Sequence, residues 1–304
     1  MKVAIIGAGR VGVTAAYTLI VQGVVNYLAL IDQNQERARG EVLDIIHGAP
    51  LLPPTSISYG NISAAEGADL VIISAGIPRQ PGESRLELAQ KNAGLIRRIM
   101  EELNLLRSVP LVLVVTNPVD VMTHVAMKAA KNSRVFGLGC VMDSLRYRSL
   151  LGTMLRVSPA NVDAMILGEH GDSMVPMLSV ASVQGIPLQQ MPGWDEEKYN
   201  QVVEQTRTGG AEVIKLKGGT YYSVALAICQ VARAIERDSR EILPVTSFCP
   251  DYMGLGEVTI SRPALVGRQG IISYPSLRPS PEEMEQLRTS AQVIQKYIQE
   301  TDNA

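Results

Sequence analysis

The feature that most constrains the fold is an alternation of apolar runs with helical patterns in the first half of the chain. The runs are apolar almost throughout, so each predicts a strand buried on both faces. Strands of this kind separated by helices indicate a parallel sheet with helices on both sides. We therefore expect a doubly wound α/β domain, which places ligands beyond the carboxyl ends of its strands. The expected strands cover residues 3–6, 27–31, 69–74, 111–115 and 135–138, and the expected helices 11–21, 35–47, 86–106 and 119–131.

After about residue 140 the pattern changes. Long helical stretches are mixed with short extended segments, which predicts a second domain of the α+β class. The expected helices cover residues 144–155, 196–216, 221–237 and 281–299, and the expected strands 162–167, 175–180, 242–247, 256–261 and 263–266.

The composition is that of a soluble globular protein, with 46% hydrophobic and 19% charged residues among 304. A net charge of −2 without a basic run argues against nucleic acid or a membrane surface as the main partner. Cys140, Cys229 and Cys249 lie far apart, so neither a disulfide framework nor a metal site is expected. No secretory signal or membrane-spanning run is visible, and we expect a cytoplasmic protein.

A glycine-rich motif follows the first expected strand. Gly7, Gly9 and Gly12 form G-x-G-x-x-G at the start of a helix, and Asp32 ends the second strand. In this context the motif indicates a Rossmann dinucleotide site, with pyrophosphate at the helix N-terminus. The Asp32 carboxylate suits ribose hydroxyls and would repel a 2′-phosphate, which favours NAD over NADP. The alternative, an ordinary turn with a surface aspartate, fits the whole strand–helix–strand context less well.

The loop after the expected strand at 69–74 carries Arg79 and Arg85 among glycines and prolines. Such a loop lies where a doubly wound sheet binds its ligand, and arginine matches carboxylates bidentately. Spacing alone leaves open whether these arginines serve a site or only face solvent.

His170 lies in Gly-Glu-His-Gly-Asp, just after an apolar strand. An imidazole is a natural proton carrier near neutral pH, and reduction of a ketone needs a proton as well as a hydride. His47, at a helix end, is expected to be structural, and His124, within a helix, to pack or to face solvent.

At this point the chain resembles the L-lactate/malate dehydrogenase family over essentially its whole length. The motifs that carry the resemblance lie, in order, at residues 7–12, 116–120, 143–148, 168–172 and 218–222. The resemblance implies an NAD-dependent dehydrogenase that moves a hydride to or from a small 2-keto or 2-hydroxy acid.

The resemblance also implies catalytic roles. His170 is the acid/base, and Asp143 binds its other ring nitrogen. Arg146 holds the substrate's C1 carboxylate as a bidentate fork. Arg85, brought in by the loop, polarises the reacting carbonyl.

Further positions complete the implied site. Asn117 orients substrate and nicotinamide, Val224 lines the nicotinamide pocket, and Thr220 lies near the substrate's variable group. The resemblance implies a homo-oligomer, a dimer or a tetramer. We expect an NAD-binding domain at residues 1–140 and a substrate domain at 141–304.

One loop position selects the substrate in this family, and alignment places Arg79 there. An arginine would pair with the second carboxylate of oxaloacetate, and an unpaired one buried over pyruvate would be costly. Glu169 and Thr220, in contrast, resemble lactate enzymes. We give Arg79 the most weight and expect malate and oxaloacetate as the substrate pair, a reaction of the tricarboxylic acid cycle, with lactate and pyruvate as the alternative.

Other classes lack their motifs: no Tyr-x-x-x-Lys, Gly-Lys-Ser/Thr, Gly-x-Ser-x-Gly or His-Glu-x-x-His is present. A non-catalytic NAD-binding sensor on the same fold remains the non-enzyme alternative. It would have no use for the proton carrier His170.

Overall fold

A computed structural model gives the structure of residues 1–77, 85–108, 110–132 and 134–302, excluding the side chains of residues 85 and 86. Within this part of the chain, a parallel sheet has its first strand in the middle, so that the strand order reverses direction there. β2 and then β3 extend it on one side, and β4, β5 and β6 on the other. The expected Rossmann arrangement is thereby confirmed. The strands are β1 (Lys2–Ile6), β2 (Tyr27–Ile31), β3 (Ser56–Gly60), β4 (Leu70–Ile73), β5 (Leu111–Val114) and β6 (Arg134–Gly137).

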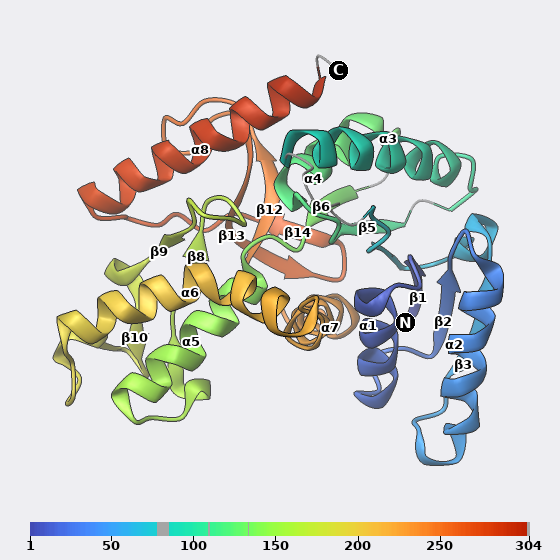
Figure 1. Cartoon of the computed structure of the whole chain (residues 1–304), viewed down its shortest axis with the longest axis horizontal. Helices are drawn as coiled ribbons and strands as arrows, with labels where there is room; N and C mark the ends of the chain where they lie inside the picture. Colours follow the sequence, from blue (N-terminus) through green and yellow to red (C-terminus); the bar gives the residue numbers. More distant parts are fainter. Residues whose placement is uncertain (78–84, 109, 133, 303–304) are drawn as a thin grey trace.

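Alternate residues of the strands face two helical layers. In β1, Val3 and Ile5 belong to one hydrophobic core, and Ala4 and Ile6 to the other. The first core is covered by α1 (Arg10–Val21), α2 (Gln35–His47) and α7 (Tyr222–Arg237), and the second by α3 (Arg85–Leu103) and α4 (Val119–Ala129) (Figure 1). Because both faces are buried, central strands such as β1, β4 and β5 need apolar residues throughout, as the sequence shows.

The sheet does not end with the first half of the chain. β12 (Glu241–Cys249), β13 (Val258–Gly267) and β14 (Gly270–Ser273) continue it as antiparallel strands beyond β6, joined by the pair Thr246 and Gly137. The sequence predicts short segments here, whereas residues 258–267 form one long strand. β12 thus contacts the segments that follow β5 and β6, through Thr246 with Asp120 and through Pro244 with Cys140.

The remaining elements form a smaller unit beside the sheet (Figure 1). α5 (Val141–Leu155) and α6 (Glu196–Lys217) pack against each other over short strands, and α8 (Pro281–Asp302) lies against β13 and α4. The short strands are β7 (Val162–Asp163), β10 (Ser182–Val183) and β11 (Ile186–Pro187) in one sheet, and β8 (Ile166–Leu167) and β9 (Val175–Pro176) in another. Within the ranges given above, no helix combines the length and the apolar character needed to cross a membrane.

Candidate active site

The glycine motif forms the turn between β1 and α1. Gly7 has a φ of +113°, and a Cβ there would lie 2.6 Å from the backbone nitrogen of Ala75. A Cβ on Gly12 would lie 1.9 Å from the carbonyl oxygen of Gly7, so the start of the helix packs directly on the turn. Both positions therefore exclude any other residue.

Gly9 differs because a Cβ there would meet nothing within 4 Å. It is the N-cap of α1, and no side chain caps the helix. The backbone at the start of the helix is therefore open to close approach, and its first N–H groups can donate hydrogen bonds to a phosphate. A dinucleotide pyrophosphate fits this place.

Asp32 lies beside this turn, at the end of β2. Its Oδ2 accepts the N–H of Ala8 at 2.7 Å, and its Oδ1 accepts the N–H of Asn34 at 2.8 Å. These bonds fix the carboxylate next to the glycine turn and leave each oxygen a further lone pair for a hydroxyl. The arrangement fits NAD.

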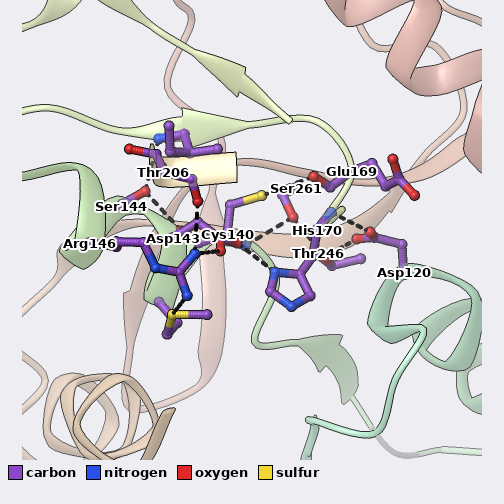
Figure 2. A network of polar contacts seen from close by, with 12 residues as sticks. Asp120, Cys140, Asp143, Ser144, Arg146, Glu169, His170, Thr206, Thr246 and Ser261 are labelled. Atoms are coloured by element: carbon purple, nitrogen blue, oxygen red, sulfur yellow. Dashed lines mark hydrogen bonds and ion pairs between the residues drawn. The ribbon is translucent and has the colours of Figure 1, made fainter. Parts of the chain in front are cut away.

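His170 and Asp143 form a hydrogen-bonded pair. Asp143 is in the first turn of α5 and is 1% exposed, and its Oδ2 lies 2.5 Å from Nδ1 of His170 (Figure 2). His170 follows β8, on a loop held by backbone hydrogen bonds between Gly168 and Ser261 of β13. Burial by itself lowers the pKa of His170, but the charge of Asp143 and its hydrogen bond outweigh this and raise the pKa to about 9.

Arg146 lies one helical turn after Asp143. Its Nη1 is 3.3 Å from Oδ1 of Asp143 and donates to the carbonyl of Thr206 on α6 at 2.9 Å. A Cβ on Gly209 would lie 3.2 Å from Cδ of Arg146. The glycine in the middle of α6 thus lets this helix approach the arginine closely, which explains a residue that disfavours helix.

Asn117 follows β5, and its peptide bond to Pro118 is cis. Its carbonyl oxygen accepts from the side chain of Asn92, which also accepts the N–H of Ile77 after β4. Asn92 is 2% exposed and joins these two loops. Asn92 was not predicted as a site residue, because nothing in a helical pattern marks a polar residue that binds two distant loops.

Two further predicted residues belong to the segment around α7. Thr220 lies between α6 and α7, and Val224, in the first turn of α7, packs in the core of the sheet. Arg85 begins α3, but its side chain is outside the described part, as is all of Arg79. The structure thus brings together His170, Asp143 and Arg146, and leaves the two loop arginines undescribed.

This combination defines a class of protein. A parallel sheet presents a dinucleotide-binding turn, and nearby loops and helices hold an imidazole that can move a proton beside a guanidinium that can bind a carboxylate. Enzymes that transfer a hydride between a nicotinamide cofactor and a small acid need these elements.

Comparisons with known proteins identify the family. Residues 1–137 match the lactate/malate dehydrogenase NAD binding domain, and residues 140–304 match the lactate/malate dehydrogenase alpha/beta C-terminal domain. The chain belongs to the lactate/malate dehydrogenase family and is an NAD-dependent enzyme of that family.

Relatives and solved structures agree with this assignment. The L-lactate dehydrogenase of Thermoanaerobacter sp. (strain X514) is 39% identical over 99% of both chains. A lactate dehydrogenase from a Medee basin deep-sea metagenome library has a TM-score of 0.94 and 31% identity, covering 99% of this chain and 98% of its own. The malate dehydrogenase of Picrophilus torridus, in its apo form, has a TM-score of 0.94 and 30% identity, covering 99% and 97%.

The expected preference for malate and oxaloacetate is wrong, and the place in the tricarboxylic acid cycle falls with it. Curated relatives at 36–40% identity over nearly the whole chain are named L-lactate dehydrogenase. The expectation gave Arg79 the most weight. An arginine in a loop costs little while its guanidinium stays in water, so its presence does not require a second substrate carboxylate. Glu169 and Thr220, which resemble lactate enzymes, are the better guide.

Proposed function

We propose that this protein is an L-lactate dehydrogenase, which interconverts L-lactate and pyruvate with NAD. The observation that carries the proposal is the shared carboxylate of Asp143, which binds the His170 imidazole through one oxygen and the Arg146 guanidinium through the other. A proton carrier and a carboxylate-binding group are thereby held at fixed positions relative to each other. The names of the relatives at 36–40% identity support lactate as the substrate.

When bound, NAD would accept the hydride from C2 of lactate, and NADH would return it to C2 of pyruvate. Nε2 of His170 takes the proton of the lactate hydroxyl, and in reverse gives it to the carbonyl oxygen of pyruvate. Asp143 stabilises the imidazolium that carries this proton and fixes the ring by binding Nδ1. Arg146 binds the C1 carboxylate, Arg85 polarises the carbonyl, and Asn117 and Thr220 contact the substrate.

The cofactor is assigned to the first part of the chain. We propose that residues 1–140 bind NAD and that residues 141–304 hold the substrate. Gly7, Gly9 and Gly12 shape the pyrophosphate site, which the open helix start at Gly9 supports. Asp32 binds the adenosine ribose, Asn117 contacts the nicotinamide, and Val224 lines its pocket.

We also propose a homo-oligomer, a dimer or a tetramer. Exposed apolar side chains gather on α1 and α7, which pack against each other, and on the end of α6. They include Tyr17, Val21, Leu216, Tyr222 and Leu226. A patch of this kind is typical of an interface between subunits.

We further propose a cytoplasmic location. The three cysteines are free and buried, which fits a reducing compartment.

The substrate assignment is tested by initial rates of NADH oxidation. Pyruvate and oxaloacetate are compared at equal concentrations and at several pH values. We expect kcat/KM to be at least about tenfold higher for pyruvate. A higher value for oxaloacetate would overturn the assignment.

A further inference from the structure

A second carboxylate lies behind the catalytic loop. Asp120 is in the first turn of α4, three residues after Asn117, and is 3% exposed. Its Oδ2 accepts the backbone N–H of His170 at 2.8 Å, and its Oδ1 accepts the hydroxyl of Thr246 at 2.5 Å (Figure 2). His170 is therefore held by two aspartates from different helices, one at its ring and one at its backbone.

The hydrogen bonds around Asp120 have a defined direction. The backbone N–H of Cys140 donates to Oγ of Ser261 at 3.2 Å, and Ser261 Oγ lies 2.9 Å from Thr246 Oγ1. A backbone N–H can only donate, so Ser261 Oγ accepts from Cys140. The Ser261 hydroxyl can then donate a hydrogen bond to Thr246, and the Thr246 hydroxyl donates one to Asp120. At the other end, the N–H of His170 also donates. Every donor in this series of hydrogen bonds has an acceptor when Asp120 accepts at both carboxylate oxygens. Asp120 can do so in its ionised form.

The charges around the two groups are consistent with this form. Burial raises the pKa of Asp120, and the charge of Glu169 raises it further. The hydrogen bonds from Thr246 and His170 and the charge of His170 lower it, and the resulting pKa is about 6. The buried Cys140 thiol also faces Asp120 and Asp143. Around His170, the charges of Asp143 and Asp120 raise the pKa and that of Arg146 lowers it.

We infer that Asp120 is a positioning residue for the reaction: it fixes the loop that carries His170 and, as a buried negative charge, favours the protonated imidazole. It comes from the helix that follows Asn117, so it also ties the Asn117 segment to the loop of the proton carrier. That the His170 proton takes part in catalysis rests on the proposed function, whereas the effect of Asp120 on the pKa of His170 does not.

The test uses Asp120→Asn, which keeps the size and one carbonyl acceptor for the N–H of His170. Removing the negative charge lowers the pKa of His170, here by about one unit. The alkaline limb of kcat/KM for pyruvate reduction therefore moves about one pH unit lower, with about a threefold loss near pH 8.5 and little loss at pH 7. Ser261→Ala is the matched control, because it disturbs the same buried pocket without touching the carboxylate. Its alkaline limb stays at the wild-type position.

A titration of the His170 ring by NMR, with His170→Gln for assignment, reports the same quantity without turnover. In the wild type, a main inflection near pH 9 and a smaller one near pH 6, where Asp120 ionises, are expected. The smaller inflection disappears in Asp120→Asn. An unchanged pKa of His170 in Asp120→Asn, or a single inflection in the wild type, would overturn the role of Asp120. If pyruvate is not turned over but the titration behaves as expected, only the proposed function fails.

Discussion

Nδ1 of His170 lies 2.5 Å from Oδ2 of Asp143, and the acid is buried in the first turn of α5 while the imidazole lies on the loop after β8. Because the ionised carboxylate can only accept, Nδ1 is the donor in this bond, and Nε2 is the ring nitrogen that can exchange a proton.

Asp143→Asn keeps the shape of this pair but removes the charge that stabilises the imidazolium. We expect kcat for pyruvate reduction to fall by about 10²- to 10⁴-fold, the usual contribution of a positioned acid. Steady-state rates with NADH test this, and the KM for NADH should change little. A loss below about fivefold would show that Asp143 does not stabilise the protonated His170 during the reaction.

Arg146→Lys removes the fork that can bind a carboxylate with two parallel hydrogen bonds. We expect the KM for pyruvate to rise about 10- to 100-fold, since one charge-assisted bond is lost. Arg148→Lys, two residues further along α5, is the control because Arg148 donates to the carbonyl of Val162 instead. Equal effects of the two substitutions would contradict the role of Arg146.

Gly209→Ala tests the close approach of α6 to Arg146. The new Cβ would lie 3.2 Å from Cδ of Arg146, so the arginine side chain must shift, while alanine favours the helix. We expect an unchanged or higher Tm together with at least about a threefold rise in the KM for pyruvate. Gly94→Ala in α3 is the control, since a Cβ there meets nothing within 4 Å. It should raise the Tm without changing the KM, and an unchanged KM in Gly209→Ala would refute the packing argument.

The raised pKa of His170 also predicts a pH dependence of stability. A group whose pKa rises from 6.5 to about 9 on folding adds stability that is complete below pH 6.5 and is lost as pH rises through 9. Its contribution is on the order of 3 kcal/mol. Urea unfolding of the wild type and His170→Gln between pH 6 and 9.5 measures it. The free energies of the two should converge as pH rises, and a constant difference would contradict the raised pKa.

Much of the fold was predictable because its signals are local. The central strands β1 and β4 of the parallel sheet are apolar on both faces, and the glycine turn at Gly7 is fixed by its own φ and by its neighbours. β3 was not predicted, because it lies at the sheet edge and its residues, from Ser56 to Gly60, are polar or half-exposed. The continuation of the sheet by β12 depends on pairing between Gly137 and Thr246, which no local pattern encodes.

The site was predictable in part, for the same reason. His170 and Asp143 stand in recognisable motifs, but Asp120 has its partner Thr246 at a separation of 126 residues, which only the folded chain reveals. The substrate preference was wrong because it was drawn mainly from the charge of Arg79, and a charge in the sequence does not show where a loop side chain lies relative to the substrate.

The central claim is tested most directly by lactate oxidation followed at the NADH absorbance band, with L-lactate and D-lactate as substrates and His170→Gln beside the wild type. We expect the wild type to produce NADH from L-lactate only. His170→Gln should bind NADH normally, as measured by fluorescence, and turn over about 10²- to 10⁴-fold more slowly. An absence of NADH formation from L-lactate by the wild type, or full activity in His170→Gln, would contradict it.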